Sequence, residues 1–143
     1  MAKFSIKKNI SLIIIFFSII LFDQLTKILV INNFQLYESM SIFPLFNLTF
    51  VVNYGFAFGF LNNSSLNQII VICVIFSIIA YFLYLLFKTQ DQFFRFSLIL
   101  VLSGAVGNFI DRVIHGFVID FIDIYLGSYH WPAFNIADSS ITL

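Results

Sequence analysis

The sequence predicts a helical membrane protein with several crossings, on two observations. First, 61% of its 143 residues are apolar and only 10% are charged, whereas an ordinary soluble domain carries about 25% charged residues. Second, the apolar residues gather in runs close to the roughly 20 residues that a helix needs to cross a bilayer. A soluble enzyme is therefore not expected. Seven basic and seven acidic residues give no net charge, so we also expect no nucleic-acid partner.

Three apolar segments are long enough to cross a membrane, and the last residues form the start of a fourth. The first segment follows basic residues, as the core of a signal peptide does, but no small-residue cleavage site comes after it. We therefore expect it to be retained. The length leaves room for about four crossings with short loops, so residues 1–143 are expected to form a single integral-membrane domain. The predicted spans are 9–31, 66–87, 96–114 and, as the start of a fourth, 135–143.

Charged residues separate onto two sides of the predicted membrane. Short loops rich in Lys and Arg stay in the cytoplasm, so we expect a cytoplasmic amino terminus. Five of the seven basic residues then fall on the cytoplasmic side, namely Lys3, Lys7, Lys8, Lys88 and Arg95. Six of the seven carboxylates gather at the outer face, namely Asp23, Glu38, Asp111, Asp120, Asp123 and Asp138. We expect the chemistry of the protein at that face.

Two segments between the predicted spans have the composition of β-strands. Leu45–Phe60 is rich in Phe, Val, Thr and Tyr and contains two glycines, which indicates a strand or a hairpin. Phe117–Tyr125 is a second β-branched and aromatic stretch. Both lie on the side of the carboxylates, so a small β-structure is expected there.

Asp23 and Lys27 are charged residues at the far side of the first apolar segment. Their i, i+4 spacing with the acid first favours an ion pair on one helix, which is one interpretation. The other is that they face the interior of a helical bundle, because a charge at the bilayer centre costs about 2.5 to 3.5 kcal/mol. Both interpretations remain open from the sequence.

The third apolar segment carries small and polar residues on one helical face. Gly104, Gly107, Asn108 and Asp111 recur at helical spacing, and Arg112 adjoins them. The glycines would allow a neighbouring helix to approach closely. Arg112 offers a planar fork of donors that can clamp a carboxylate or carbonyl oxygens. We interpret the three polar groups as functional, since a polar helix end alone does not require all of them.

Asp120 and Asp138 are the strongest candidates for catalysis. Each has a simple alternative: Asp120, like Asp123, as a solvated loop residue, and Asp138 in the first turn of a helix capped by Asn135. Together, two carboxylates on separate elements can share one proton, so that one accepts a proton from water while the other donates to a carbonyl. Such a pair would hydrolyse a peptide bond without a covalent intermediate.

Other chemistries fit the sequence less well. His115 and His130 have neither a Gly-x-Ser-x-Gly setting nor a cysteine partner of a known motif. No pair of possible ligands has the spacing of a known zinc site. A small transporter is a further alternative. It would need a polar pathway across the membrane, but the second span is almost without polar residues.

Five motifs follow one another along nearly the whole chain. They are Asp23-Gln24-Leu25-Thr26-Lys27, Asn53-Tyr54-Gly55-Phe56-Ala57-Phe58-Gly59, Gly104-Ala105-Val106-Gly107-Asn108-Phe109-Ile110-Asp111-Arg112, Gly116-Phe117-Val118-Ile119-Asp120-Phe121 and Pro132-Ala133-Phe134-Asn135-Ile136-Ala137-Asp138. In this order they resemble the motif set of bacterial lipoprotein signal peptidase, also called signal peptidase II.

The resemblance implies an aspartic endopeptidase of the bacterial inner membrane. Such an enzyme removes signal peptides from prolipoproteins just before a cysteine that carries diacylglycerol. The implied catalytic dyad is Asp120 and Asp138. The implied fold is a bundle of four transmembrane helices with a small extracytoplasmic β-platform. Prolipoproteins and membrane lipids are the implied partners, a monomer is expected, and no metal or organic cofactor is implied.

The resemblance also implies residues that bind substrate or orient the dyad. Asn53 and the turn from Gly55 to Gly59 would line the substrate groove. Asp23 and Lys27 would be polar positions at the outer end of the first helix. The complete implied set outside the dyad is Asn53, Gly55, Asn108, Asp111, Arg112, Asn135, Asp23 and Lys27.

The chain departs from the family pattern in two places. Ser103 stands where the family often has the first glycine of a Gly-Gly-Ala run, a change that still permits close packing. After Asp138, only Ser139 to Leu143 follow, about 7.5 Å of helix at roughly 1.5 Å per residue. Either the sequence is truncated, or the fourth span is missing and Asp138 is poorly anchored. In the second case the alternative function is a non-catalytic membrane protein that binds lipoproteins or partner helices.

Overall fold

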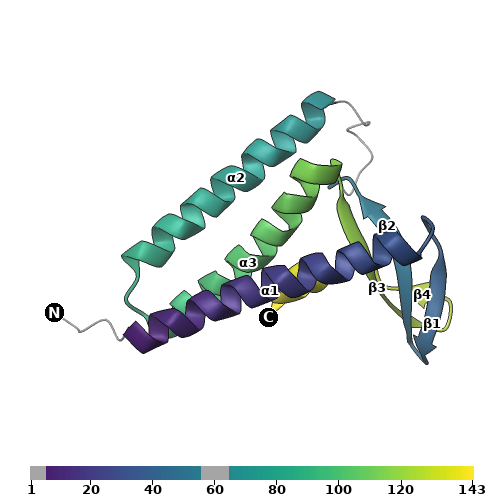
Figure 1. The fold of residues 1–143 in the computed structure, drawn as a ribbon, viewed down its shortest axis with the longest axis horizontal. Coiled ribbons are helices and arrows are strands. Elements are labelled where there is room, and N and C mark those ends of the chain that lie inside the picture. Colours follow the sequence, from purple (N-terminus) through teal and green to yellow (C-terminus); the bar gives the residue numbers. More distant parts are fainter. Residues whose placement is uncertain (1–5, 56–64) are drawn as a thin grey trace.

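The computed structural model describes residues 6–55 and 65–143. Within these residues it contains helices at one side and a small sheet at one end (Figure 1). The helices are α1 (Ile6–Asn33), α2 (Ser65–Lys88), α3 (Gln92–His115) and α4 (Ile136–Thr142). The strands are β1 (Ser39–Phe43), β2 (Phe46–Asn53), β3 (Val118–Leu126) and β4 (Tyr129–His130).

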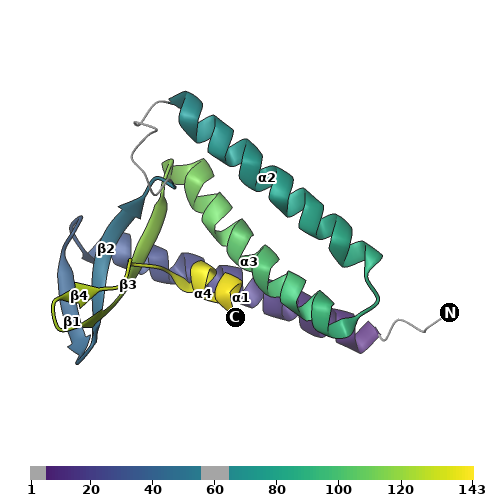
Figure 2. The same ribbon diagram turned by 180° about the vertical axis from the view of Figure 1, so that it is seen from behind.

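Three helices among the described residues are long and apolar enough to cross a membrane. These are Ile10–Asn33, Gln68–Lys88 and Gln92–His115, and they coincide with the three predicted spans. Both ribbon views show the short α4 against α1 and α3, with the sheet beyond the carboxyl end of α1 (Figure 2). The carboxyl-terminal helix α4 therefore packs against α1, the first helix of the chain, and against α3.

The third helix begins earlier than its apolar run predicts. Asp91 is its N-cap, and its side chain accepts a hydrogen bond of 2.7 Å from the backbone N–H of Phe94, which satisfies a free donor of the first turn. The helix ends at Gly116, which has a left-handed φ of 80° and donates its N–H to the carbonyl of Arg112. Capping residues, rather than hydrophobicity, thus set both ends of α3.

The first helix ends at Asn33, two residues beyond its predicted span, and its charged pair lies well before that end. α1 continues from Asp23 to Asn33, about 15 Å further along the axis at roughly 1.5 Å per residue. Asp23 and Lys27 therefore lie within the helix and not at its outer end. The predicted span ended at Ile31, two residues too early, because Asn32 and Asn33 continue the helix without being apolar.

The sheet is antiparallel in the order β1-β2-β3-β4. The strand or hairpin expected within 45–60 is confirmed as strand β2, which forms a hairpin with β1, a strand that precedes the predicted segment. Residues 56–60 of that prediction lie outside the described residues. β2 pairs with β3, with an irregularity between Leu48 and Val51.

The predicted strand at 117–125 is confirmed as β3, which is also the most buried strand of the sheet. Its residues Ile119 and Phe121 form an apolar cluster with Val30 of α1. Asp120 is 2% exposed and Asp123 is 7% exposed, so neither is a solvated loop residue. The apolar cluster fixes β3 against α1 and thereby sets where Asp120 can point.

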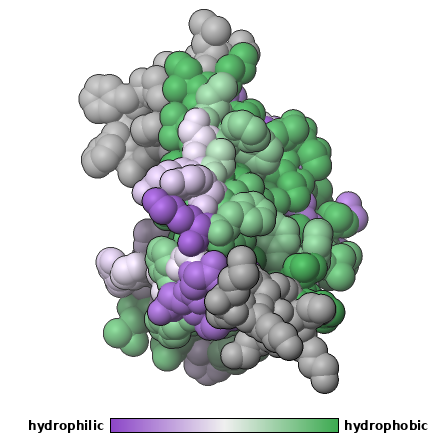
Figure 3. All heavy atoms as spheres, turned by 90° about the vertical axis from the view of Figure 1, so that its left-hand side faces the viewer, coloured by the Kyte–Doolittle hydropathy of each residue, from purple (hydrophilic) through white to green (hydrophobic). Residues whose placement is uncertain are grey.

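Apolar side chains cover much of the outer surface. Many large apolar residues of α1 and α2 are exposed, among them Phe17, Phe22, Phe76 and Tyr81. The space-filling view shows large apolar areas around a smaller polar region (Figure 3). Such a surface is costly in water and favourable in lipid, in agreement with helices that cross a membrane.

Candidate active site

Asn135 and Asp138 begin α4 with a reciprocal capping box. The side chain of Asn135 accepts the backbone N–H of Asp138 at 2.8 Å, and Asp138 Oδ2 accepts the backbone N–H of Asn135 at 3.2 Å. The capping role considered for both residues is thus confirmed. It occupies only one oxygen of Asp138, and the other, Oδ1, accepts a hydrogen bond of 2.7 Å from Asn108 Nδ2.

Asp120 lies on β3 between two amide side chains. Its Oδ1 accepts a hydrogen bond of 2.7 Å from Asn135 Nδ2, and its Oδ2 accepts one of 3.0 Å from Asn53 Nδ2. Burial raises the pKa of Asp120 to about 6, and the charge of Asp138 acts in the same direction. The hydrogen bonds from the two amides oppose this shift without cancelling it.

Asn135 joins the two carboxylates into one site. Its amide nitrogen donates to Asp120, while its amide oxygen accepts from the backbone of Asp138. The tertiary structure therefore brings Asp120 and Asp138, which are on separate elements, to the two sides of one amide group. A carboxyl with a raised pKa beside a second carboxylate is the arrangement that acid/base hydrolysis requires.

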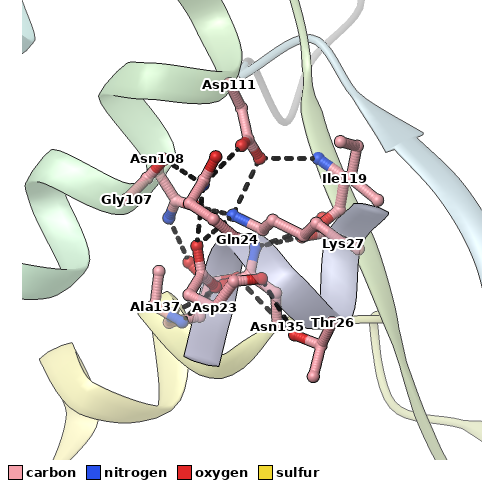
Figure 4. Close-up of polar contacts among 12 residues, drawn as sticks. Asp23, Gln24, Thr26, Lys27, Gly107, Asn108, Asp111, Ile119, Asn135 and Ala137 are labelled. Atoms are coloured by element: carbon pink, nitrogen blue, oxygen red, sulfur yellow. Dashed lines mark hydrogen bonds and ion pairs between the residues drawn. The ribbon is translucent and has the colours of Figure 1, made fainter. Parts of the chain in front are cut away.

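Lys27 occupies the centre of the polar region between α1 and α3 (Figure 4). Its Nζ lies 2.8 Å from Asp23 Oδ2 and 2.7 Å from Asp111 Oδ2, and it donates a hydrogen bond of 3.0 Å to Asn108 Oδ1. The Lys27 side chain is 1% exposed. Both interpretations of the pair on α1 thus hold: it forms an ion pair along the helix and also faces the interior.

Gln24 belongs to the same polar region, although its sequence position alone indicated no role. Its Nε2 donates to Asp111 Oδ1 at 2.9 Å and to the carbonyl of Gly107 at 3.2 Å. An amide within an apolar span was the available signal, because a buried amide needs partners. Gln24 therefore adds a second connection between α1 and α3.

The two glycines of α3 allow the close approach that their spacing predicts. A Cβ atom on Gly107 would lie 2.8 Å from Asp23 Oδ2, and one on Gly104 would overlap the carbonyl oxygen of Ala137. Larger residues here would push α1 or α4 away from α3. Ser103, the departure from the family pattern, is fully buried and donates its hydroxyl to the carbonyl of Leu100.

Arg112 lies against Gly55 at the end of α3. Gly55 has a φ of 94°, and a Cβ atom there would lie 2.7 Å from Arg112 Nη2. Arg112 is 8% exposed, and within residues 6–55 and 65–143 its Nε and Nη1 have no hydrogen-bond partner. No carboxylate of those residues forms an ion pair with it. The rest of the predicted groove turn, 56–59, lies outside the described residues.

A second polar cluster surrounds Asp123, further along β3. Asn47 Nδ2 and Thr49 Oγ1 each donate to Asp123 Oδ2 at 3.1 Å, and His130 Nδ1 lies 2.8 Å from Oδ1. Burial disfavours the charged carboxylate, but these hydrogen bonds outweigh it and lower the pKa of Asp123. In the described part of the chain, no three His, Cys, Asp or Glu side chains gather closely enough to hold a metal ion.

Comparison with known proteins identifies the family. The sequence model described as Signal peptidase (SPase) II matches residues 15–143. The chain belongs to the signal peptidase II family. Family membership indicates a protease that acts in lipoprotein processing.

Curated members of the signal peptidase II family are similar over most of the chain. The lipoprotein signal peptidase of Burkholderia mallei strain SAVP1 is 44% identical over 137 residues, which cover 87% of this chain and 76% of that protein. The lipoprotein signal peptidase of Alteromonas mediterranea is 43% identical over 122 residues, which cover 83% of this chain and 67% of that protein.

Two solved structures of bacterial membrane enzymes resemble this signal peptidase II fold. The one determined at 2.3 Å resolution has a TM-score of 0.77 and 35% sequence identity, and the match covers 92% of this chain and 80% of that chain. The one at 1.9 Å has a TM-score of 0.75 and 35% identity, covering 92% and 85%. These matches and the apolar helices indicate a multi-pass membrane protein.

Proposed function

We propose that the protein is an aspartic endopeptidase that removes signal peptides from prolipoproteins, cleaving before a diacylglyceryl-modified cysteine. The observation that carries the proposal is the convergence of Asp120 and Asp138 on Asn135. The names of the curated relatives supply the substrate class, since they are lipoprotein signal peptidases. The positions of both carboxylates support the catalytic dyad that the motifs imply.

The dyad acts as a pair that shares one proton. Asp120 suits the role of proton holder, because burial raises its pKa to about 6. As water attacks the scissile carbonyl carbon, Asp138 accepts the proton of the water while Asp120 donates its own proton to the carbonyl oxygen. The tetrahedral diol then collapses: a proton passes to the leaving nitrogen, the C–N bond breaks, and the dyad regains its single shared proton.

The residues around the dyad have supporting roles in this proposal. Asn108 and Asn135 orient the carboxylates through the hydrogen bonds described above. Asn53 and Gly55 line the entry of the substrate, and Arg112 orients the peptide backbone with donors that no described residue occupies. A guanidinium with free donors is well suited to carbonyl oxygens, because all its hydrogen-bonding groups are donors.

The membrane arrangement follows the family resemblance and the charge pattern. The amino terminus is cytoplasmic, and the sheet and dyad lie toward the outer face of the bacterial inner membrane. α4 corresponds to the start of the fourth transmembrane helix, and the sheet corresponds to the extracytoplasmic β-platform. The protein works as a monomer on lipid-modified substrates at the headgroup boundary, where water is available for hydrolysis. No described feature of the site favours the non-catalytic binder.

A cleavage assay tests the proposal directly. A diacylglyceryl-modified prolipoprotein is incubated with the protein in lipid, and the loss of the signal peptide is followed by its shift in gel mobility. We expect cleavage by the unmodified protein and by Asp123→Asn, which alters a carboxylate outside the dyad, and none by Asp138→Asn. Substrate binding without cleavage by the unmodified protein would instead support the non-catalytic binder.

A further inference from the structure

Asp23, Lys27 and Asp111 form a buried ionic cluster, here called the Lys27 brace. The ammonium group of Lys27 joins the carboxylates of α1 and α3 at 2.8 and 2.7 Å, and each of the three side chains is at most 1% exposed. A buried charge left without its partner is strongly unfavourable. The three groups are therefore bound to one another in a fixed geometry.

The Asp23 arm of the brace reaches α4. Asp23 uses Oδ2 for Lys27 and Oδ1 to accept the backbone N–H of Ala137 at 2.8 Å. Ala137 immediately precedes Asp138 in the first turn of α4. The carboxylate of Asp23 thus fixes the backbone from which one member of the dyad projects.

The Asp111 arm of the brace holds the backbone of β3 in the same way. Asp111 Oδ2 accepts the backbone N–H of Ile119 at 3.2 Å as well as contacting Lys27. Ile119 immediately precedes Asp120 on the strand. Each carboxylate of the brace therefore holds the residue just before one dyad aspartate, and Lys27 connects the two arms.

Lys27 also determines the orientation of the Asn108 amide. An ammonium group has donors but no acceptor, so it binds the oxygen of Asn108, at 3.0 Å. The amide nitrogen is thereby directed to Asp138 Oδ1, to which it donates at 2.7 Å. Asn135 Nδ2 supports the same orientation, since it donates to the Asn108 oxygen at 3.1 Å.

We propose that the Lys27 brace positions the dyad: Asp23 and Asp111 set the placement of Asp138 and Asp120, and Lys27 couples both arms while directing the Asn108 amide. This inference rests on the proposed peptidase function and deepens it. The three residues are positioning residues, because their buried side chains contact the backbone and amides beside the dyad and leave the reacting groups to Asp120 and Asp138.

The charges of the brace give the proposal a measurable signature. Among the described residues, the charged groups near the dyad are Arg112 from α3 and the brace from α1 and α3, whose Lys27 acts on Asp120, while β2 contributes the neutral Asn53. Removing the positive charge of Lys27 disfavours ionised carboxylates nearby, and removing the negative charge of Asp111 favours them. A role in folding alone would not shift the pH profile in opposite directions.

The experiment measures the pH dependence of prolipoprotein cleavage for Lys27→Gln, Asp111→Asn and the double variant. We expect kcat to fall about tenfold to a hundredfold in each, with KM little changed, because the dyad is misplaced. The inflections should move up by about half a pH unit in Lys27→Gln and down in Asp111→Asn. Lys88→Gln, the same change at an exposed lysine, is the matched control with an unchanged profile.

The double variant separates charge from geometry. It has the same net charge in the brace as the unmodified protein, so its inflections should return toward their original pH while kcat stays low. Unshifted profiles, or shifts of the same sign in both single variants, would overturn the inference. If Lys27→Gln does not fold, Asp111→Asn, which is isosteric, tests the inference by itself through the expected downward shift of the inflection. Absence of cleavage by the unmodified protein would instead overturn the proposed function.

Discussion

Two aspartates on one strand, Asp120 and Asp123, have opposite properties. Both are largely buried, but the pKa of Asp120 is raised to about 6 whereas that of Asp123 is lowered. They are three positions apart, so they point to opposite faces of β3. Asp123 meets three donors from the sheet itself, while Asp120 meets two amides and the charge of Asp138.

The difference shows that burial alone does not determine protonation. The sheet offers Asp123 enough hydrogen bonds to compensate for the loss of water, so it stays charged and structural. Asp120 faces the helices, where α4 brings a second carboxylate close to it. The same residue type on the same strand thus has its pKa raised or lowered according to what the neighbouring elements present to it.

The largest contrast is expected from removing each carboxylate in turn. Asp120→Asn should lower kcat about a thousandfold, since it removes a group that transfers protons, while Asp123→Asn should stay within about twofold. Initial rates of prolipoprotein cleavage measure both. Comparable losses in the two variants would mean that the opposite environments of the aspartates have no functional meaning.

The next effect is the pH dependence of cleavage. If Asp120 donates the proton, kcat/KM should fall as the pH rises above about 6, where this carboxyl ionises, by about tenfold for each further pH unit. Asp123→Asn should leave that inflection in place. A profile that is flat between about pH 5 and 8 would contradict the assignment of the raised pKa to the reacting pair.

Asn53 and Asn47 offer a matched pair of smaller changes, because each is a β2 amide that donates to one of the two aspartates. Asn53→Ala should lower kcat about tenfold and move the inflection to higher pH, since Asp120 loses a donor that favours its charged form. Asn47→Ala should leave cleavage unchanged and cost about 1 kcal/mol of stability. An equal loss of cleavage in both would show that the amides only support the sheet.

The smallest effect concerns stability at low pH. The lowered pKa of Asp123 stabilises the folded chain above the ordinary aspartate pKa near 3.8, and this contribution is lost as the pH falls through the folded value. Asp120 contributes in the opposite sense, with stability present below about 3.8 and lost as the pH rises through about 6. The stability difference between the unmodified protein and Asp123→Asn should therefore shrink below about pH 4, as measured by thermal unfolding in lipid. A stability difference between the two proteins that does not change with pH would contradict a lowered pKa for Asp123.

Local patterns in the sequence predicted much of this protein. Runs of apolar residues located the long helices, because crossing a bilayer depends on length and hydrophobicity. The helical spacing of Gly104 and Gly107 indicated a close helix contact, and Asn135 with Asp138 indicated a helix start. The strand at 117–125 followed from its β-branched and aromatic residues. Each of these properties depends on neighbours within a few residues.

Other features were decided only when distant segments packed together. The sequence placed Asp23 and Lys27 in the first helix and left open whether they face the interior, but only the structure shows them in contact with Asp111. The strand β1 was missed, because its exposed residues carry little pattern and it forms by pairing with β2. The spacing of Asp120 and Asp123 likewise contains no sign of their opposite protonation.

The sequence by itself thus determined which segments are long and apolar enough to cross a membrane, which family the motifs resemble and which residues are candidates for the chemistry. The tertiary structure decided which of those residues meet: the two carboxylates on Asn135, and the Lys27 brace behind them. The physical reason is that hydrophobicity and helical spacing are local properties of the chain. Hydrogen-bond partners, burial and the charge beside a carboxyl depend instead on the packing of α1, α3, α4 and the sheet.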